Sequence, residues 1–304
     1  MGGHPIFFLH GGPGSHSRAA HRRYFDPDFF DIVQFDQRGC GKSVPAGETQ
    51  QNDTWALVED INSIRDALGI SQKVSLLGGS WGSTLALAYT LRHPQQVREL
   101  ILRGVFLGSD AELDWFTRDL ARFAPEAWAQ FSDGMGENLL ESYYQAVHST
   151  DQHRASVAAR RWAEYEMQLM RISSESQEQS PLAAAGPAEA TPTLRTPELT
   201  APGLINSARV QLHFLKHQCF LADSPLLDAA QNIHVPVTIV QGRLDLVCPP
   251  ITAYQLSERL PHAKLRMVSN AGHSALSGSL ALALREEVDG LRDRLLRSQT
   301  GGPR

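Results

Sequence analysis

Short apolar runs that stop at glycine-rich loops open the chain. Residues 5–9 and 31–36 are two such runs, and each leads directly into a loop, at residues 10–14 and 37–43. Apolar runs of this length that end at turn residues are typical of buried parallel strands. Residues 53–69 instead repeat apolar side chains at helical spacing and end at a glycine, which predicts a helix.

The alternation continues after this helix. Residues 74–77 form a third apolar run, small and helix-forming residues follow Trp81, and residues 99–105 form a fourth run. The order is therefore strand, loop, strand, helix, strand, helix, strand. This order is the signature of a doubly wound parallel sheet, so we expect parallel strands with helices on both faces.

Helical segments without a convincing strand mark the middle of the chain. The predicted helices there are 111–123, 137–148, 151–170 and 204–220. Residues 173–203 are dense in Ser, Pro, Ala, Glu and Thr, so they cannot bury enough apolar surface to offset their ordering entropy. We predict a helical cap that contains a flexible loop at 173–203.

The strand pattern returns in the last quarter of the chain. Residues 236–242 and 264–268 are predicted strands, and residues 252–260 and 280–296 are predicted helices. The sequence thus predicts an α/β fold, a doubly wound and mostly parallel sheet with an inserted helical cap. The expected division is core 1–107, cap 108–230 and a second part of the core 231–304.

Composition and charge narrow the possible partners. The 304 residues are 42% hydrophobic and 20% charged, which is ordinary for a globular enzyme. A net charge of −5 argues against nucleic acid or an anionic membrane as a partner. The three cysteines, Cys40, Cys219 and Cys248, have no metal-site spacing and cannot all pair. With no leader-like or membrane-spanning run, we expect a cytoplasmic protein without metal or cofactor.

A serine lies on the turn between the third strand and its helix. Gly78, Ser80 and Gly82 form the pattern G-x-S-x-G, which is that of a nucleophile elbow. A serine hydroxyl needs a histidine base, and the histidine needs a carboxylate to fix its tautomer. Asp245 follows one late strand and His273 follows the next, in the order this fold class requires. We therefore predict Ser80, Asp245 and His273 as a catalytic triad.

Acyl transfer also requires hydrogen-bond donors for the oxyanion. The backbone N–H of Trp81, directly after the nucleophile, is one candidate. The glycine loop at residues 10–14 supplies the other, and Gly12 is the predicted donor because absent side chains let the backbone approach the substrate.

Six sequence blocks resemble one family. HGGPG, DQRGCGKS, GGSWGSTLALAY, LRGVFL, GRLDLVCP and AGHS look like the proline iminopeptidases, serine peptidases of the α/β-hydrolase fold that release N-terminal proline. The resemblance runs over nearly the whole chain except residues 173–203. It implies small peptides with a free N-terminus as substrates, and it leaves the oligomeric state open.

The resemblance also implies a substrate pocket. It places Phe106, Phe116 and Cys248 around the proline ring, and Arg103 close to an acidic subsite that recognises the free amino end. Two cap glutamates share that amine in the family. Here Glu166 keeps the first position, in the segment WAEYE, whereas Gln211 stands at the second and offers only a neutral acceptor.

One departure and two alternatives remain. Family members usually have a strand hairpin before the HGGPG strand, whereas only residues 1–4 precede it here, so we expect the strand at 32–35 to form a sheet edge. The same core also supports an esterase or amidase acting on small acyl substrates. A truncated, non-catalytic protein of this fold is the second alternative, although the intact predicted triad argues against it.

Overall fold

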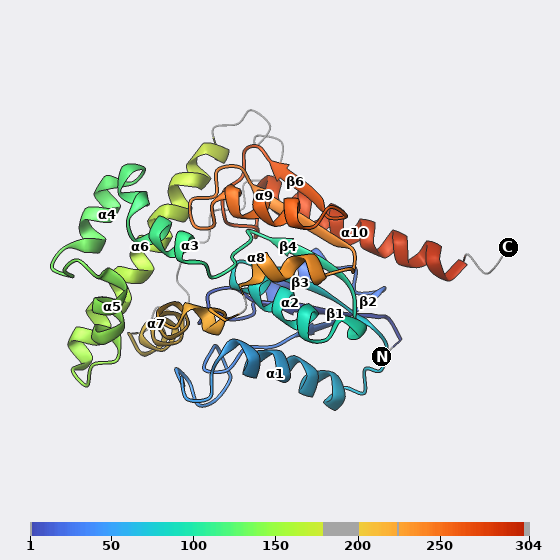
Figure 1. Ribbon diagram of the computed structural model, residues 1–304, viewed down its shortest axis with the longest axis horizontal. Helices are drawn as coiled ribbons and strands as arrows, with labels where there is room; N and C mark the ends of the chain where they lie inside the picture. Colours follow the sequence, from blue (N-terminus) through green and yellow to red (C-terminus); the bar gives the residue numbers. More distant parts are fainter. Residues whose placement is uncertain (1, 179–200, 224, 301–304) are drawn as a thin grey trace.

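A parallel sheet forms the centre of the molecule (Figure 1). The computed structural model describes residues 2–178, 201–223 and 225–300. Within them, six strands pair in the order β2-β1-β3-β4-β5-β6, every pair parallel. The strands are β1 His4–Leu9, β2 Phe30–Gln34, β3 Val74–Gly79, β4 Val97–Arg103, β5 Val237–Gly242 and β6 Lys264–Val268. The predicted fold class is confirmed.

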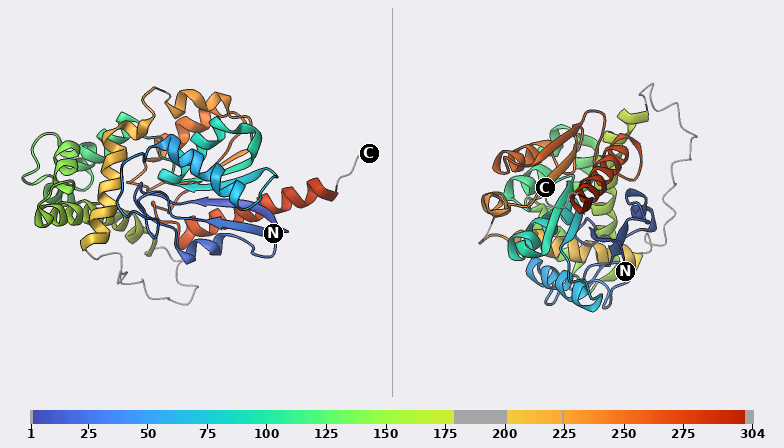
Figure 2. Two further views of the ribbon diagram at one scale, coloured as in Figure 1. Left: turned by 90° about the horizontal axis from the view of Figure 1, so that it is seen from below. Right: turned by 90° about the vertical axis from the view of Figure 1, so that its right-hand side faces the viewer.

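Helices cover both faces of this sheet, which is why its central strands are buried throughout. Every residue of β3 and of β5 is buried. One face packs against helices α1, α2 and α9, and the other against α10 and a short 3-10 helix, as Figure 2 shows. Their bounds are α1 Thr54–Ala67, α2 Trp81–Arg92, α9 Pro250–Arg259, α10 Gly278–Thr300 and, for the 3-10 helix η1, Ala19–Tyr24.

The helices between β4 and β5 gather beyond one end of the sheet, at the left of Figure 1. They are α3 Asp110–Thr117, α4 Pro125–Ser132, α5 Leu139–Val147, α6 Gln152–Glu178 and α7 Ala201–Lys216, and the short α8 Leu226–Ala229 follows them before β5. They share an aromatic core, in which the rings of Phe131 and Tyr165 stack at 4.1 Å between centroids. Trp162 contacts Phe131 and Tyr143 in the same cluster.

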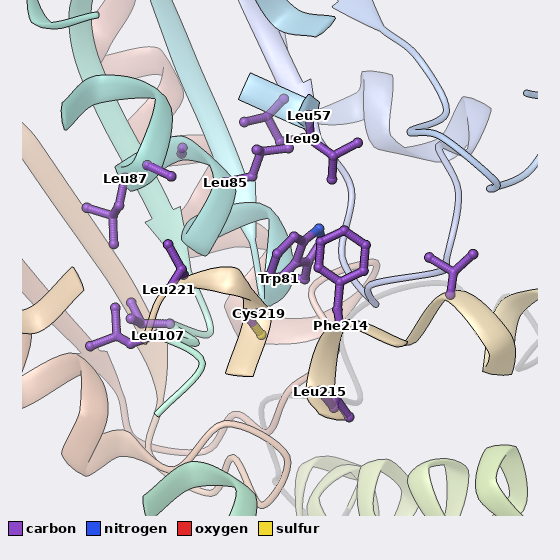
Figure 3. Close-up of a cluster of buried hydrophobic side chains, with 14 of the residues drawn as sticks. Leu9, Leu57, Trp81, Leu85, Leu87, Leu107, Phe214, Leu215, Cys219 and Leu221 are labelled. Carbon is purple, nitrogen blue, oxygen red and sulfur yellow. The ribbon is translucent and has the colours of Figure 1, made fainter. Parts of the chain in front are cut away.

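The core and these helices meet at Trp81 (Figure 3). Trp81 begins α2, is fully buried, and its ring lies edge-on to Phe214 of α7 at 4.8 Å between centroids. Leu215, Cys219 and Leu221 continue the same cluster. The residue after the predicted nucleophile is therefore also the point where α7 packs on the sheet domain.

Several expectations can be compared with these elements. The predicted helix 111–123 is α3 followed by a 3-10 helix at Asp119–Arg122, and α4, which begins at a proline, was not predicted. The predicted loop 173–203 is wrong at both ends, because residues 173–178 continue α6 and residues 201–203 begin α7. Residues 179–200 lie outside the described residues.

The expected sheet edge is confirmed. In the described residues β2 pairs with β1 alone, so it forms one edge of the sheet, and β6 forms the other. The domain boundaries at 108 and 230 stay predictions. Among the helices of the described ranges, none is both long and apolar enough to cross a membrane.

Two glycines in helices offer a test of how tightly the core is packed. A Cβ on Gly82 of α2 would lie 2.0 Å from the carbonyl oxygen of Leu9, whereas a Cβ on Gly290 of α10 would meet only the flexible end of Arg294. We expect Gly82→Ala to lower the free energy of unfolding by about 1–3 kcal/mol through overpacking. We expect Gly290→Ala to raise it by about 0.5–1 kcal/mol through helix propensity. Urea unfolding of both variants checks this, and equal effects would contradict it.

Candidate active site

Ser80 lies on a strained turn between β3 and α2. Its backbone has φ 55° and ψ −126°, a region that residues with side chains rarely occupy. The turn is held by hydrogen bonds from Ser80 N to Arg103 O at 2.8 Å and from Ser83 N to Ser80 O at 2.8 Å. A Cβ on Gly78 would lie 2.1 Å from the Gly82 oxygen, so the turn requires glycine before the serine. The geometry is that of a nucleophile elbow.

Asp245 and His273 form a buried pair at the same edge of the sheet. They follow β5 and β6, and Oδ2 of Asp245 lies 2.8 Å from Nδ1 of His273. The other oxygen, Oδ1, accepts hydrogen bonds from the backbone N–H groups of Val247 and Cys248. An ionised carboxylate only accepts, so His273 carries its proton on Nδ1 and leaves Nε2 unprotonated, as a base must be.

The Ser80 hydroxyl points at Cys248 in this state. Its Oγ lies 3.7 Å from Cys248 Sγ, and within the described residues no hydrogen bond joins Ser80 to His273. Burial, with the nearby Asp245 charge, raises the pKa of the Cys248 thiol, so the sulfur stays protonated and uncharged. Catalytic hydrogen bonds of this kind are often long or poorly aligned before substrate binds.

Arg103 lies beside the loop that carries His273. Its Nη1 donates to the carbonyl oxygen of His273 at 2.8 Å and lies 3.4 Å from the Nε2 of that ring. Among the described residues that line the cavity with Glu166, Arg103 is absent. Two features of the sheet explain this position. Arg103 ends β4, next to β5. Gly79 leaves room for the Arg103 guanidinium, since a Cβ on Gly79 would lie 2.5 Å from Nη2 of Arg103. The contact of Arg103 with an acidic subsite, which the family resemblance implies, stays a prediction.

The glycine loop after β1 lies against the elbow. A Cβ on Gly11 would be 3.2 Å from the Cβ of Ser80, so no larger side chain fits there without displacement. Gly12 has φ 116° and shares a cavity with Ser80. The loop and the first turn of α2 therefore flank the hydroxyl, which is the arrangement that two oxyanion donors require.

One cavity brings most of the predicted site residues together. Seven of them line it: Gly12, Ser80, Phe106, Phe116, Glu166, Gln211 and Cys248. Trp162, Leu113 and Val247 also line it and were not predicted as pocket residues. Apolar and aromatic walls with a few convergent polar groups are typical of a small-molecule site.

Gln211 is oriented by its neighbours. The indole Nε1 of Trp162 lies 3.0 Å from Gln211 Oε1, and because an indole N–H only donates, the amide oxygen must face it. The amide nitrogen then donates to Oε1 of Glu166 at 2.6 Å. The sequence predicted Gln211 as a neutral acceptor for the substrate amine. Its oxygen already accepts from Trp162, and because an amide oxygen has two lone pairs, that role stays a prediction.

Glu166 has an unusual charge state as a result of its position. It is half-buried in the wall of the cavity, and burial raises its pKa to about 7 despite the opposing hydrogen bond from Gln211. Its second oxygen, Oε2, has no hydrogen-bond partner among the described residues. Glu166 can therefore offer one free oxygen to a cation that enters the cavity.

Glu112 is a cavity residue that sequence reasoning missed. Its carboxylate accepts from the backbone N–H groups of Leu107 and Ser109 and from the Ser109 hydroxyl. Burial raises its pKa. The capping-box spacing of Ser109 and Glu112 was a visible signal for the helix start. That signal did not show that the same carboxylate fixes the loop after Phe106.

The two glycine loops, at residues 10–14 and 37–43, also contact α7. A Cβ on Gly14 would lie 2.3 Å from the Ser207 oxygen and 3.2 Å from Gln211 N, and one on Gly39 would lie 2.9 Å from the Val210 side chain. The backbone of α7 thus rests directly on the first loop, and its Val210 side chain rests on the second. Within the described ranges, no three His, Cys, Asp or Glu side chains are grouped so that they could hold a metal ion.

Comparison with known proteins relates the chain to one fold family and to one group of enzymes. The sequence model of the α/β-hydrolase fold family matches residues 4–278. The chain is 40% identical to a proline iminopeptidase of Arabidopsis thaliana, over 90% of this chain and 70% of that protein. It is 38% identical to a proline iminopeptidase of Neisseria gonorrhoeae, over 97% of this chain and 90% of that protein.

A solved structure agrees in fold. A proline iminopeptidase-related protein from Thermus thermophilus superposes with a TM-score of 0.56 at 24% identity, covering 94% of this chain and 88% of that one. At 24% identity, this similarity supports a shared fold and nothing more.

Replacing the elbow serine separates catalysis from folding. We expect Ser80→Ala to lower turnover by about 10⁶-fold, because the nucleophile is lost while alanine occupies the same backbone. Thermal unfolding should stay close to that of the wild type. Ser83→Ala is the control: its hydroxyl supports Ser80 O, so this variant should be less stable yet still react with a fluorophosphonate probe. Labelling of Ser80→Ala by the probe would contradict the assignment of Ser80 as the nucleophile.

Proposed function

Since the chain belongs to the α/β-hydrolase fold family and, within it, to the proline iminopeptidases, we propose that it is a serine aminopeptidase that releases N-terminal proline from small peptides. Ser80 attacks the carbonyl carbon of the first residue, and Nε2 of His273 takes the hydroxyl proton. Asp245 holds the imidazole in the required tautomer and stabilises its positive charge. The leaving amine then takes that proton, and water hydrolyses the acyl-enzyme.

The tetrahedral intermediate carries a negative oxygen that needs donors. In this proposal the backbone N–H groups of Trp81 and Gly12 supply them, and both residues flank Ser80. Such donors act strongly because they are fixed before the reaction and lie out of water. Removing one donor typically costs about 100- to 1000-fold in turnover.

The observation that carries the aminopeptidase proposal is Glu166 in the same cavity as Ser80. Its free oxygen suits the positive amine of an N-terminal residue, because an isolated cation would otherwise pay the full cost of leaving water. Phe106, Phe116 and Trp162 line the remaining wall, and their apolar surfaces suit a pyrrolidine ring. Residues 108–230 act as the cap that supplies Glu166 and Gln211.

An esterase or amidase with small acyl substrates is the second candidate. One feature favours it: Glu166 is already hydrogen-bonded to Gln211, and with its pKa at about 7 it is only partly charged near neutral pH. A site for neutral acyl groups would need no more charge than this.

The free thiols of Cys40, Cys219 and Cys248 support a reducing compartment such as the cytoplasm.

A direct comparison of substrates tests the proposal. We expect the purified protein to hydrolyse a prolyl arylamide with a higher kcat/KM than an acetyl ester of the same leaving group class, because only the prolyl substrate offers an amine to Glu166. An N-acetylprolyl arylamide, which lacks the charged amine, is the matched control and should be a poor substrate. Faster hydrolysis of the acetyl ester would favour the esterase instead.

The charge of Glu166 sets a pH dependence. A carboxyl group with a pKa of about 7 is neutral below that pH and charged above it, so KM for the prolyl arylamide should rise as pH falls through about 7. Dividing kcat/KM for the prolyl substrate by that for the ester removes the pH dependence that the two reactions share. Glu166→Gln should abolish the pH dependence of this ratio and raise KM for the prolyl arylamide by roughly tenfold above pH 7.

Gln211→Glu should act in the opposite direction. A second carboxylate at this position would share a proton with Glu166 until the substrate ammonium replaces it. KM for the prolyl arylamide should then fall by roughly tenfold while ester hydrolysis stays nearly unchanged. If neither Glu166→Gln nor Gln211→Glu alters turnover of the prolyl arylamide, the cap does not bind the substrate amine.

A further inference from the structure

A buried chain of hydrogen bonds joins the glycine loop after β1 to the start of α2. It consists of His10, Gln37 and Trp81, which are exposed by 1%, 2% and 0% of their surfaces. These residues come from three separate segments, and the proposed mechanism gives none of their side chains a role. Buried polar groups destabilise a protein unless all of them are hydrogen-bonded, and these side chains bond to one another and to the backbone.

The orientation of Gln37 is fixed without ambiguity. The indole Nε1 of Trp81 lies 2.8 Å from Gln37 Oε1, and an indole N–H can only donate, so the amide oxygen must face Trp81. The amide nitrogen then donates to the backbone carbonyl of His10 at 3.0 Å. One side chain therefore connects residue 81 to residue 10.

The backbone of Gln37 fixes the imidazole of His10 as well. Its N–H donates to Nε2 of His10 at 3.0 Å, so that nitrogen must be the acceptor and the proton sits on Nδ1. Nδ1 in turn lies 2.9 Å from the carbonyl oxygen of Gly11 and donates to it. Burial lowers the pKa of His10 to about 4, so the ring stays neutral and keeps this pattern at physiological pH.

These contacts hold the two segments that carry the proposed oxyanion donors. Gly11 and Gly12 have no side chains of their own, so the path of the loop depends on His10 at its beginning and on α7 beyond Gly14. Trp81 is itself the residue whose backbone N–H is the other proposed donor. The bridge through Gln37 is the direct side-chain link between them in the described structure.

We propose that Gln37 is a positioning residue that sets the distance between the two oxyanion donors, the backbone N–H groups of Gly12 and Trp81. The inference rests on the proposed use of Ser80 as nucleophile, but it does not depend on proline specificity. A donor works only within about 2.7–3.1 Å of the oxyanion, and a misplacement of about 1 Å can cost on the order of 100-fold in rate.

Gln37→Met tests the proposal because methionine matches the shape of glutamine without its hydrogen bonds. We expect kcat to fall about 10- to 100-fold for the prolyl arylamide and for the acetyl ester alike, since both pass through an oxyanion. KM and the inhibition constant of free proline should stay unchanged. The aldehyde analogue of proline, which forms a tetrahedral adduct with the serine, should bind more weakly by the same factor as kcat falls.

Two further variants separate positioning from general loosening. Asn52→Leu removes another buried amide from the same loop, one that donates to the carbonyls of Arg38 and Glu48 and contacts neither His10 nor Trp81. It should lose stability and keep kcat. Gln37→Glu keeps an acceptor for Trp81 and can donate to the His10 carbonyl only when burial keeps its carboxyl group protonated, so its kcat should lie between wild type and Gln37→Met.

Specific results would overturn the proposal. Unchanged kcat in folded Gln37→Met, an equal loss in Asn52→Leu, or weaker proline binding without weaker aldehyde binding would each do so. If neither Gln37 variant folds, its role is structural and the proposal fails. If the wild type cleaves the ester but no prolyl substrate, the proposed specificity fails while the ester measurements still decide the role of Gln37.

Discussion

Ser80 is held at a positive φ of 55°, a conformation that a residue with a side chain keeps only when its surroundings leave no alternative. That constraint comes from the crossing of β1, β3 and α2, which leaves space for hydrogen atoms alone at Gly78 and Gly82. The crossing raises the hydroxyl above the carboxyl edge of the sheet. The same crossing places the loop after β1 beside it, so the position of every group that faces the substrate depends on this packing.

The sequence predicted what depends on local pattern. Apolar runs and turn residues located all six strands, and the spacing of Asp245 and His273 after the last two strands predicted a pair that the structure shows hydrogen-bonded. These signals are informative because the burial of a strand and the chemistry of the loop after it depend on residues that are consecutive in the sequence.

The pattern of the sequence did not show the contacts between residues far apart in the chain. Arg103 turns to the His273 loop 170 positions later, the oxygen of Gln211 is engaged by Trp162 49 positions earlier, and Gln37 meets Trp81 44 positions on. No periodicity records such side-chain pairings. The early stop predicted for α6 was wrong, because a polar composition does not exclude a helix that continues beyond its packed face.

The seating of α7 on the glycine loops has a consequence for how this site can change. Its backbone touches Gly14 and the Val210 side chain lies against Gly39, so the helix cannot shift without also displacing the loop beside Ser80. Side chains that project from α6 and α7 into the cavity carry no such restriction. New specificities on this scaffold should therefore arise by exchanging residues such as Glu166 and Gln211 in place, whereas insertions or rotations of α7 would impair the chemistry itself.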